Sequence, residues 1–408
     1  MKLKIIIVSI LFLGFMQMQG QPINGQDSNA DHINVITTAV PFLMIAPDAR
    51  AGSMGDAGVS TKADVYSMHW NPAKYAVMES DMSVGLSYSP WLRNLVPDMN
   101  LAYLAFAKRI DNMSTFAATL RYFTLGSIQF TNDQGIEIGN YDPNEWAVDA
   151  TYSRKLTDNL SGAVSGRFIY SNLTQGQDVQ SIETSAGWSI ASDVAVFWQK
   201  DVNWFPDISS NFAWGINISN IGAKVGYSQF TIKKDFIPTN LRFGPTLTLD
   251  IDDYNTIAFS IDVNKLLVPS PPIYLRDSLG PVLIEGTDEY VIDKGMTDDV
   301  SVVKGMVQSF YDAPGGFGEE MRELSFSVAT EYWYNKVFAL RGGMFYEDAS
   351  KGNRKFFTLG AGLHYNVFAL DFSYLIPVNS GNSTGTNPLQ NTLRFALTFD
   401  LAEMGNKE

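Results

Sequence analysis

The sequence predicts an all-β protein, a transmembrane outer-membrane β-barrel of about 14 antiparallel strands whose lumen holds an N-terminal plug, called the hatch below. Three observations predict this fold: the composition, a period-two alternation of apolar and polar residues, and a glycine- and proline-dense segment before that alternation. Aromatic residues make up 13% of the chain and charged residues only 18%, whereas soluble domains average about 25% charged residues. A mean hydropathy of −0.04 is too polar for a bundle of membrane-spanning helices.

The N-terminus has the pattern of a secretory signal peptide. Two lysines precede an apolar run from Ile5 to Phe15, and small and polar residues follow it. The run is shorter than the roughly 20 residues that a membrane-spanning helix needs. We therefore expect a cleaved signal peptide over residues 1–20 and a flexible N-terminus over residues 21–34. Because the chain has no cysteine, disulfides, thiolate metal sites and an acylated N-terminal cysteine are excluded.

Residues 35–80 differ from the rest of the chain in their density of glycine and proline. Pro41 to Pro47 and Ala51 to Gly58 are two such stretches, and their composition prevents a long helix or strand. We interpret residues 35–80 as the hatch, built from short helical turns and loops. Its candidate motif is formed by Asn71, Pro72 and Ala73.

From Met82 onward, apolar and polar residues alternate over long segments. Val148 and Tyr152, for example, alternate with Asp149 and Ser153. Tilted strands that cross a bilayer need about ten residues, whereas strands of soluble proteins average about 5–6. We therefore predict a barrel over residues 81–402 and a C-terminal tail over residues 403–408. The predicted strands are 82–90, 99–109, 114–125, 143–155, 160–172, 183–199, 209–220, 238–250, 254–265, 322–334, 336–347, 354–365, 366–376 and 389–402.

The lengths of the connections assign them to the two faces of the membrane. Short connections such as 110–113, 155–159 and 365–366 suit periplasmic turns. One connection, residues 266–321, is exceptional in length, and loops this long are uncommon without a function or secondary structure of their own. The other long and polar connections, which we expect on the extracellular side, are 131–142, 171–183, 201–207, 221–237, 350–353 and 378–389.

Ionisable residues of both signs fall on the polar face of the predicted strands. Facing lipid, each would cost several kcal/mol near the middle of the bilayer, so we expect them to point into the lumen. We interpret them as ion pairs that neutralise one another and hold the barrel and hatch together. The alternative is a selectivity ladder for a permeant solute. The predicted lumen ion-pair residues are Arg121, Arg167, Arg242, Arg341, Arg394, Asp149, Asp193, Asp262, Glu331 and Asp371.

The sequence contains no convincing catalytic, cofactor or metal site. Ser67, His69 and Asp64 are the residue types of a catalytic triad, but three neighbours on one irregular loop seldom converge in that geometry. The run from Asp250 to Asp253 lacks the spacing and the glycine of a calcium loop. A net charge of −14 argues against nucleic-acid binding. We therefore expect a non-enzymatic protein that binds no cofactor, no metal and no nucleic acid.

The long connection 266–321 carries apolar and aromatic residues among acidic ones. Such side chains next to water usually mark an interface, so we expect a protein partner there. The alternative is a loop that folds over the mouth of its own barrel and buries these residues. The candidate partner-binding residues are Pro269, Pro271, Pro272, Ile273, Tyr274, Phe310, Tyr311 and Phe317.

Several motifs resemble those of a known family. Residues 49–57, followed by Asn71-Pro72-Ala73, resemble the hatch of FadL-like outer-membrane barrels. More specific motifs give the chain a close resemblance to PorV, the outer-membrane β-barrel family of the Bacteroidetes type IX secretion system. This resemblance covers essentially the whole mature chain. The motifs that carry it are residues 40–50, 70–75, 262–269, 331–334 and 340–343.

The resemblance implies a plugged barrel in the outer membrane of a Gram-negative bacterium, in contact with outer-membrane lipid and lipopolysaccharide. It also implies that the protein binds secreted cargo through the cargo's C-terminal domain, takes it from the translocon barrel and passes it to a cell-surface attachment complex with a transpeptidase. Two other classes stay open. One is a FadL-like transporter of hydrophobic small molecules, and the other is an outer-membrane lipid-modifying enzyme, which the missing catalytic constellation disfavours.

Overall fold

The computed structural model describes most of the chain after residue 32. The predicted signal peptide (1–20), nearly all of the predicted flexible N-terminus (21–34) and the predicted tail (403–408) lie outside the described residues. The described residues are 33–93, 98–131, 135, 137–173, 176, 184–228, 234–278, 280–285, 289–378, 389–390 and 392–401.

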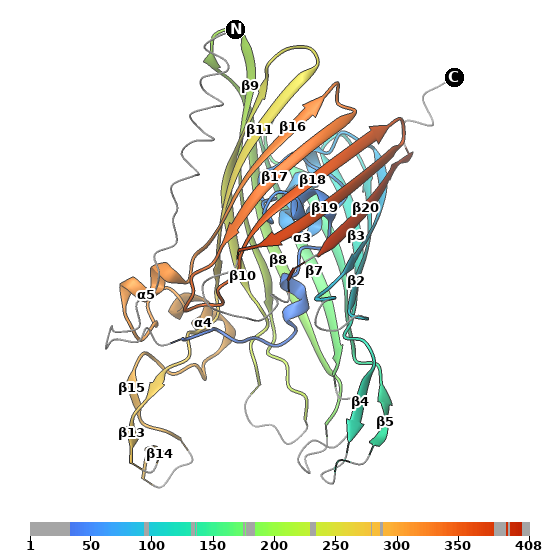
Figure 1. Ribbon diagram of the computed structural model, residues 1–408. Coiled ribbons are helices and arrows are strands. Elements are labelled where there is room, and N and C mark those ends of the chain that lie inside the picture. The colour runs from blue at the N-terminus through green and yellow to red at the C-terminus, as the bar shows by residue number, and fades with distance from the viewer. Residues whose placement is uncertain are drawn as a thin grey trace.

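Among the described residues, fourteen strands form one closed antiparallel barrel (Figure 1). Each strand pairs with its neighbours in chain order, and the first strand pairs with the last, with Ser83 opposite Asp400. The predicted all-β barrel is thereby confirmed. The barrel strands are β1 (Met82–Pro90), β2 (Asn100–Arg109), β3 (Ser114–Thr124), β6 (Asn144–Lys155), β7 (Leu160–Asn172), β8 (Gly187–Phe205), β9 (Ile208–Gly222), β10 (Asn240–Asp250), β11 (Asn255–Leu266), β16 (Ser325–Tyr334), β17 (Phe338–Tyr346), β18 (Lys355–Tyr365), β19 (Phe368–Pro377) and β20 (Leu393–Asp400).

The barrel wall has a polar inner face and an apolar outer face. In β6, Asp149 and Ser153 are buried, whereas Val148 and Tyr152 are exposed. This alternation follows from strand geometry, because successive side chains point to opposite faces of a sheet. An outer face of aliphatic and aromatic side chains is stable against lipid rather than water. No helix among the described residues is long and apolar enough to cross a membrane.

The short turns lie at one end of the barrel and the long connections at the other (Figure 1). We assign the end with the short turns to the periplasm. The prediction of an external loop at 201–207 is wrong, because β8 continues to Phe205, which pairs with Ile208 of β9 in a hairpin at the periplasmic end. Polar residues such as Asp201 and Asn203 occur in this strand because it extends past the short turns of its neighbours.

The hatch lies inside the barrel and runs from its external mouth to its periplasmic end (Figure 1). At the mouth, the Asn34 backbone N–H donates to the Ser350 carbonyl (3.1 Å). At the periplasmic end, the Arg109 guanidinium donates to the carbonyls of Met78 and Glu79. The helical elements of the hatch are the 3₁₀ turns η2 (Pro41–Met44) and η3 (Pro72–Val77) and the single α-helical turns α2 (Ala49–Gly52) and α3 (Ser67–Trp70).

The connection 266–321, which we call the insertion, folds into a small structure of its own at the external mouth. It contains the helices α4 (Val302–Gln308) and α5 (Phe317–Arg322). It also contains two short strand pairs, β12 (Ile273–Tyr274) with β15 (Ile292–Lys294) and β13 (Arg276–Asp277) with β14 (Gly280–Pro281). A separate external hairpin, β4 (Ile128–Thr131) with β5 (Glu137–Tyr141), extends from the other side of the mouth (Figure 1).

Candidate functional site: the hatch, the lumen and the insertion

Close backbone contacts hold the hatch against the barrel wall. A Cβ atom added to Gly343 of β17 would overlap the backbone of Met54 and Gly55, and one added to Gly215 of β9 would overlap the Val59 carbonyl. Gly55 also has a φ of +62°, a conformation that residues with a side chain rarely adopt. Glycines in the wall therefore allow the backbone of the hatch to approach the strands closely.

The side chain of Asn71 joins the hatch to itself and to the wall. Its carbonyl oxygen accepts a hydrogen bond from the Ala73 N–H (3.0 Å) and so caps η3. Its amide group donates to the carbonyls of Val59 in the hatch and Val196 in β8, both at 3.0 Å. Pro72 occupies the start of η3, where a missing N–H costs little.

The next residues of the motif contact two further strands. The Ala73 carbonyl accepts hydrogen bonds from the hydroxyls of Ser153 in β6 (3.1 Å) and Ser161 in β7 (2.8 Å). The Ala76 N–H donates to the Ser153 hydroxyl (3.1 Å). The motif at residues 71–73 therefore attaches the hatch to β6, β7 and β8.

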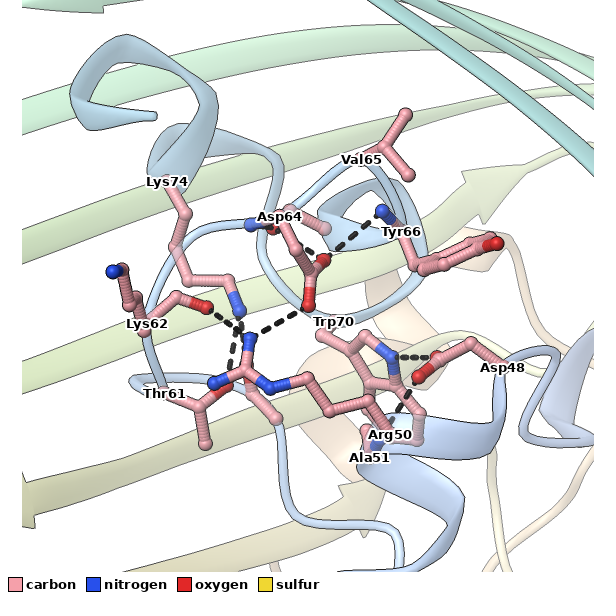
Figure 2. A network of polar contacts seen from close by, with 12 residues as sticks. Asp48, Arg50, Ala51, Thr61, Lys62, Asp64, Val65, Tyr66, Trp70 and Lys74 are labelled. Atoms are coloured by element: carbon pink, nitrogen blue, oxygen red, sulfur yellow. Dashed lines mark hydrogen bonds and ion pairs between the residues drawn. The ribbon is translucent and has the colours of Figure 1, made fainter. Parts of the chain in front are cut away.

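A buried cluster around Arg50 ties separate parts of the hatch together (Figure 2). Arg50 contacts Asp64 of the hatch (2.8 Å) and makes a bidentate pair with Glu331 of β16 (3.0 and 2.9 Å). Asp48 accepts a hydrogen bond from the indole N–H of Trp70 (2.6 Å). Arg50 is not among the lumen charges predicted from the sequence, although an arginine in a glycine-rich segment that is expected to be buried is a signal for such a role.

Two of the predicted lumen arginines lie between two carboxylates each. A buried guanidinium is stable in this setting because its charge is matched and its donors are used. Arg167 of β7 contacts Asp149 of β6 and Asp193 of β8 (3.0 Å), and Arg341 of β17 contacts Glu331 (2.7 Å) and Asp371 of β19 (2.6 Å).

Arg121 and Arg242 are buried in the lumen but bind the hatch instead of a carboxylate. Arg121 donates to the Leu43 carbonyl (2.7 Å) and to Nδ1 of His69 (2.9 Å). The Arg242 guanidinium lies 4.6 Å from the centre of the Trp70 ring, a favourable cation–π distance. No ion pair joins either arginine to a carboxylate within the described part of the chain, which corrects their interpretation as members of ion pairs.

Asp262 and Arg394 also contact the hatch backbone. The Asp262 carboxylate accepts hydrogen bonds from the N–H groups of Gly58 (2.7 Å) and Val59 (2.9 Å). Arg394 donates to the Gly52 carbonyl (3.2 Å) and lies 3.9 Å from an oxygen of Asp56. Charged residues of two separate strands, β11 and β20, thus attach the hatch to the wall.

Two cavities flank the hatch among the described residues. A cavity of about 460 Å³ lies on the periplasmic side and is lined by polar and ionisable residues that include Asp64, Lys336 and Asp371. A smaller cavity of about 90 Å³ lies toward the external mouth, beside Arg242 and Lys351. Charged groups in both linings favour water over an apolar ligand.

The geometry of the triad candidates does not suit catalysis. The Ser67 hydroxyl donates to Asp64 (3.3 Å), while Nδ1 of His69 accepts from Arg121 (2.9 Å). The candidate calcium run forms a hairpin turn, in which the Asp252 carboxylate accepts hydrogen bonds from the backbone N–H groups of Tyr254 and Asn255. Within the described ranges, no group of three or more histidine, aspartate or glutamate side chains has a metal-binding geometry.

Two buried lysines anchor the insertion to the barrel. Lys265, at the end of β11, contacts Glu320 of α5 (3.1 Å) and Glu323 (2.7 Å). Lys351, in the connection between β17 and β18, contacts Glu319 (2.5 Å) and the same Glu323 (3.0 Å). The inner face of the insertion is therefore charged and bound to the barrel.

The same region holds Asn34, the residue just before the hatch. The Asn34 side chain donates to Glu319 (3.0 Å) and to the Pro271 carbonyl (3.2 Å). Nearby, the Asp312 carboxylate accepts a hydrogen bond from the Ser270 N–H (3.2 Å). Burial raises the pKa of Asp312 to about 6. The start of the hatch, the insertion and the barrel mouth thus share one polar network.

The predicted partner-binding residues divide into two groups. Pro269 and Pro272 are buried, which removes these two prolines from the available surface, and Pro271, Ile273 and Tyr274 are half-buried. Phe310, Tyr311 and Phe317 are exposed, and the exposed fraction of Phe317 is 78%. Pro269 is buried because the chain leaving β11 packs against α4, where Pro269 lies next to Gly305, and Pro272 lies next to Gly295.

The family comparison agrees with this architecture. A model of the family described as "Type IX secretion system protein PorV" matches residues 27–273, more than half of the chain. The chain belongs to the PorV family. It is accordingly an outer-membrane protein of a Gram-negative bacterium and a component of the type IX secretion system, and the predicted PorV resemblance is confirmed. No curated protein matches the sequence.

Several solved outer-membrane barrels are similar to this PorV-family chain over most of their length. The Pseudomonas putida toluene transporter TodX is 10% identical with a TM-score of 0.46, covering 90% of this chain and 99% of TodX. The Ralstonia pickettii toluene transporter TbuX is 11% identical with a TM-score of 0.41, and the match covers 86% of this chain and 96% of TbuX. A FadL homologue from Pseudomonas aeruginosa is 10% identical with a TM-score of 0.38, covering 87% and 99%.

Proposed function

We propose that this PorV-family chain is a non-enzymatic subunit that binds secreted cargo proteins through their C-terminal domains at the cell surface. The observation that carries the proposal is the contrast between the lumen and the insertion. The lumen is filled by a hatch that hydrogen bonds and ion pairs fix to the wall. The insertion is anchored by its charged inner face and presents Phe310, Tyr311 and Phe317 to the outside.

The proposal assigns the chain a place between two other assemblies. It receives cargo from the translocon barrel of the secretion system and passes it to a surface attachment complex with a transpeptidase. Family membership and the external position of the insertion support this order, because a surface that binds cargo outside the membrane acts after translocation. The buried ion pairs of the lumen support a closed barrel rather than a route for the cargo.

Shortening the insertion between Pro272 and Gly318 tests the proposal. The shortened protein should still assemble, as judged by heat-modifiable mobility on gels, while cargo no longer reaches the cell surface. Shortening the β4–β5 hairpin between Thr131 and Glu137 is the control, and cargo display should survive it. Unchanged cargo display after shortening the insertion would contradict the proposal.

The alternative function is transport of hydrophobic small molecules, and one observation favours it. The pairing of β8 with β9 shifts register between Ser192 and Val194, and a bulged strand can open a barrel wall sideways. Under the cargo-binding proposal, the intact protein shows little conductance in planar bilayers and deletion of residues 35–79 raises it. Large, stable channels from the intact protein, or uptake of a hydrophobic solute that depends on it, would favour the transporter.

A further inference from the structure

Both helices of the insertion bury polar side chains and leave large apolar side chains exposed. Surface helices normally bury apolar residues and expose polar ones. Here Gln308, Asp312 and Glu320 are buried, whereas Val303 is 71% exposed and Phe317 is 78% exposed. We call the exposed apolar side chains of α4, α5 and their connection the apolar ridge, which consists of Val303, Val307, Phe310, Tyr311, Phe317 and Met321.

The strand pairs of the insertion form a second surface beside the ridge. We call the described residues 273–278, 280–285 and 289–294 the acidic ribbon, because Asp277, Glu285, Glu289 and Asp293 are exposed on it. Exposed apolar residues lie among these carboxylates, including Leu283 and Tyr290. The whole insertion holds ten acidic and three basic residues, a net charge of −7.

The ridge and the ribbon adjoin at the base of the ribbon. A Cβ atom added to Gly295, which follows β15, would lie 3.0 Å from the Pro314 side chain and 3.3 Å from the Asp312 carbonyl. Both of those residues belong to the connection between α4 and α5. The end of the ribbon therefore packs against the segment that joins the two helices of the ridge.

The insertion does not cover the ridge itself. Lys265 and Lys351 bind Glu319, Glu320 and Glu323 on the inner side of α5, so the opposite side of the helix faces outward. A lipid surface is also disfavoured as the occupant, because the outer leaflet carries phosphate groups and would repel an insertion of net charge −7. A protein that brings basic residues to the ribbon meets no such penalty.

We propose that the apolar ridge and the acidic ribbon form one docking surface for a protein domain whose apolar contact patch is bordered by lysines and arginines. This inference rests on the proposed function and specifies the chemistry of the partner, since the domain is the C-terminal domain of the cargo. The ridge supplies the desolvated centre of the interface. The ribbon supplies charge complementarity, which guides association and selects among partners.

The test measures binding of a purified C-terminal domain, taken from a protein that the same bacterium secretes by this system, to the full chain in detergent. Two double variants are compared with the wild type at about 50 mM and about 300 mM salt. Phe310→Ser with Phe317→Ser alters the ridge, and Glu285→Lys with Asp293→Lys alters the ribbon. Leu156→Ser and Asp158→Lys, on the exposed periplasmic turn after β6, are the matched controls.

Each variant has its own expected result. The ridge variant should bind about tenfold more weakly or worse at both salt concentrations, a loss of about 1.4 kcal/mol. The ribbon variant should bind about tenfold more weakly at low salt and should lose the salt dependence of the wild type. Both control variants should bind within about twofold of the wild type. Heat-modifiable mobility of each variant checks that its barrel is assembled.

The outcomes separate this inference from the proposed function. If the wild type binds the domain and the ridge or ribbon variant binds equally well, the docking surface is overturned while the proposed function stands. If the wild type binds no cargo domain at all, the proposed function fails and the assigned partner fails with it. The remaining alternative is that the ridge contacts lipid. Because the chain has no cysteine, a fluorescent dye can be attached to the single cysteine of Phe317→Cys. Quenching of this dye by brominated lipids would place the ridge in the membrane and overturn the proposal.

Discussion

Gly343 of the barrel wall and Gly55 of the hatch lie so close together that neither has room for a side chain. A Cβ atom on Gly343 would overlap the backbone nitrogen of Gly55, and one on Gly55 would lie 2.6 Å from the backbone nitrogen of Met344. Gly342, one residue earlier, has room for a side chain, because a Cβ atom added to it would lie no closer than 3.7 Å to its nearest neighbour, a Leu359 methyl group. Adjacent glycines of β17 therefore have different roles.

Replacing Gly343 by alanine should weaken the attachment of the hatch. The added methyl group meets backbone atoms that cannot rotate away, and overpacking of this kind costs about 1–3 kcal/mol. Ala57 is a buried hatch residue, so a single cysteine introduced there reacts with a thiol reagent only when the hatch loosens. Its reaction rate should rise by about tenfold or more in Gly343→Ala. Gly342→Ala is the control, and equal labelling rates in the two variants would contradict the role of Gly343.

Replacing Arg50 by methionine should destabilise the hatch. Asp64 and Glu331 both lose a partner, and breaking a buried ion pair costs about 3–5 kcal/mol. Because Glu331 keeps Arg341, we expect a loss near the lower end of that range, measured as a lower unfolding temperature. Lys62→Met is the control, since its pair with Glu79 is exposed and should contribute less than about 1 kcal/mol. Similar losses in both variants would refute the anchoring role of Arg50.

The docking of α4 should weaken as the pH rises from about 4 to about 6. Burial raises the pKa of Asp312 from its usual 3.8 to about 6, so the folded insertion holds this proton more tightly than the unfolded one. Stability from this group is therefore full below pH 4 and falls through that window, by at most about 3 kcal/mol.

Hydrogen exchange of α4 measures this effect when wild type and Asp312→Asn are compared at the same pH. Intrinsic exchange rates cancel in that comparison. The difference between the two proteins should change between pH 4 and pH 6 and should be constant above pH 7. A constant difference over the whole range would show that Asp312 does not titrate there.

Replacing Lys351 by methionine should loosen the first residues of the hatch. Lys351 pairs with Glu319, and Glu319 also accepts a hydrogen bond from Asn34. Without the lysine, the half-buried Glu319 carboxylate loses its cation, which favours its movement into water. A cysteine at Ala39, which is buried and whose backbone N–H donates to the Phe236 carbonyl in the connection between β9 and β10, should then react faster with a thiol reagent added outside the cell. Arg354→Met, which removes a neighbouring ion pair with Glu347, should leave that rate nearly unchanged.

The barrel could be predicted from the sequence because alternation determines which face a side chain occupies. The pattern at Val148 and Asp149 distinguishes lipid from lumen regardless of what else the lumen contains. The same pattern does not reveal which groups meet across the lumen. Arg121 and Arg167 have the same sequence signal, yet one binds hatch carbonyls and the other binds two carboxylates. That difference depends on the path of the hatch.

Other features had no local sequence signal. The strand through Asp201 and Asn203 continues past its neighbours, so it has no lipid-facing pattern to identify it. Pro269 is buried by tertiary packing against α4 and Pro272 by packing next to Gly295, whereas the composition of this segment indicated an exposed loop. The glycine spacing at Gly342 and Gly343 was part of the family resemblance, but only the position of the hatch explains why Gly343 is required.

The path of the hatch has a consequence for biogenesis. The chain enters the lumen at the mouth, where Asn34 is held, and leaves it at the opposite end, just before β1 begins at Met82. Once the barrel is closed, a segment that runs through the lumen from one end to the other can enter only if its N-terminus is threaded through the barrel. We therefore expect β1 and β20 to pair last, around a hatch that is already in place. The machinery that inserts this protein into the membrane must then keep β1 and β20 apart until residues 33–80 lie between them.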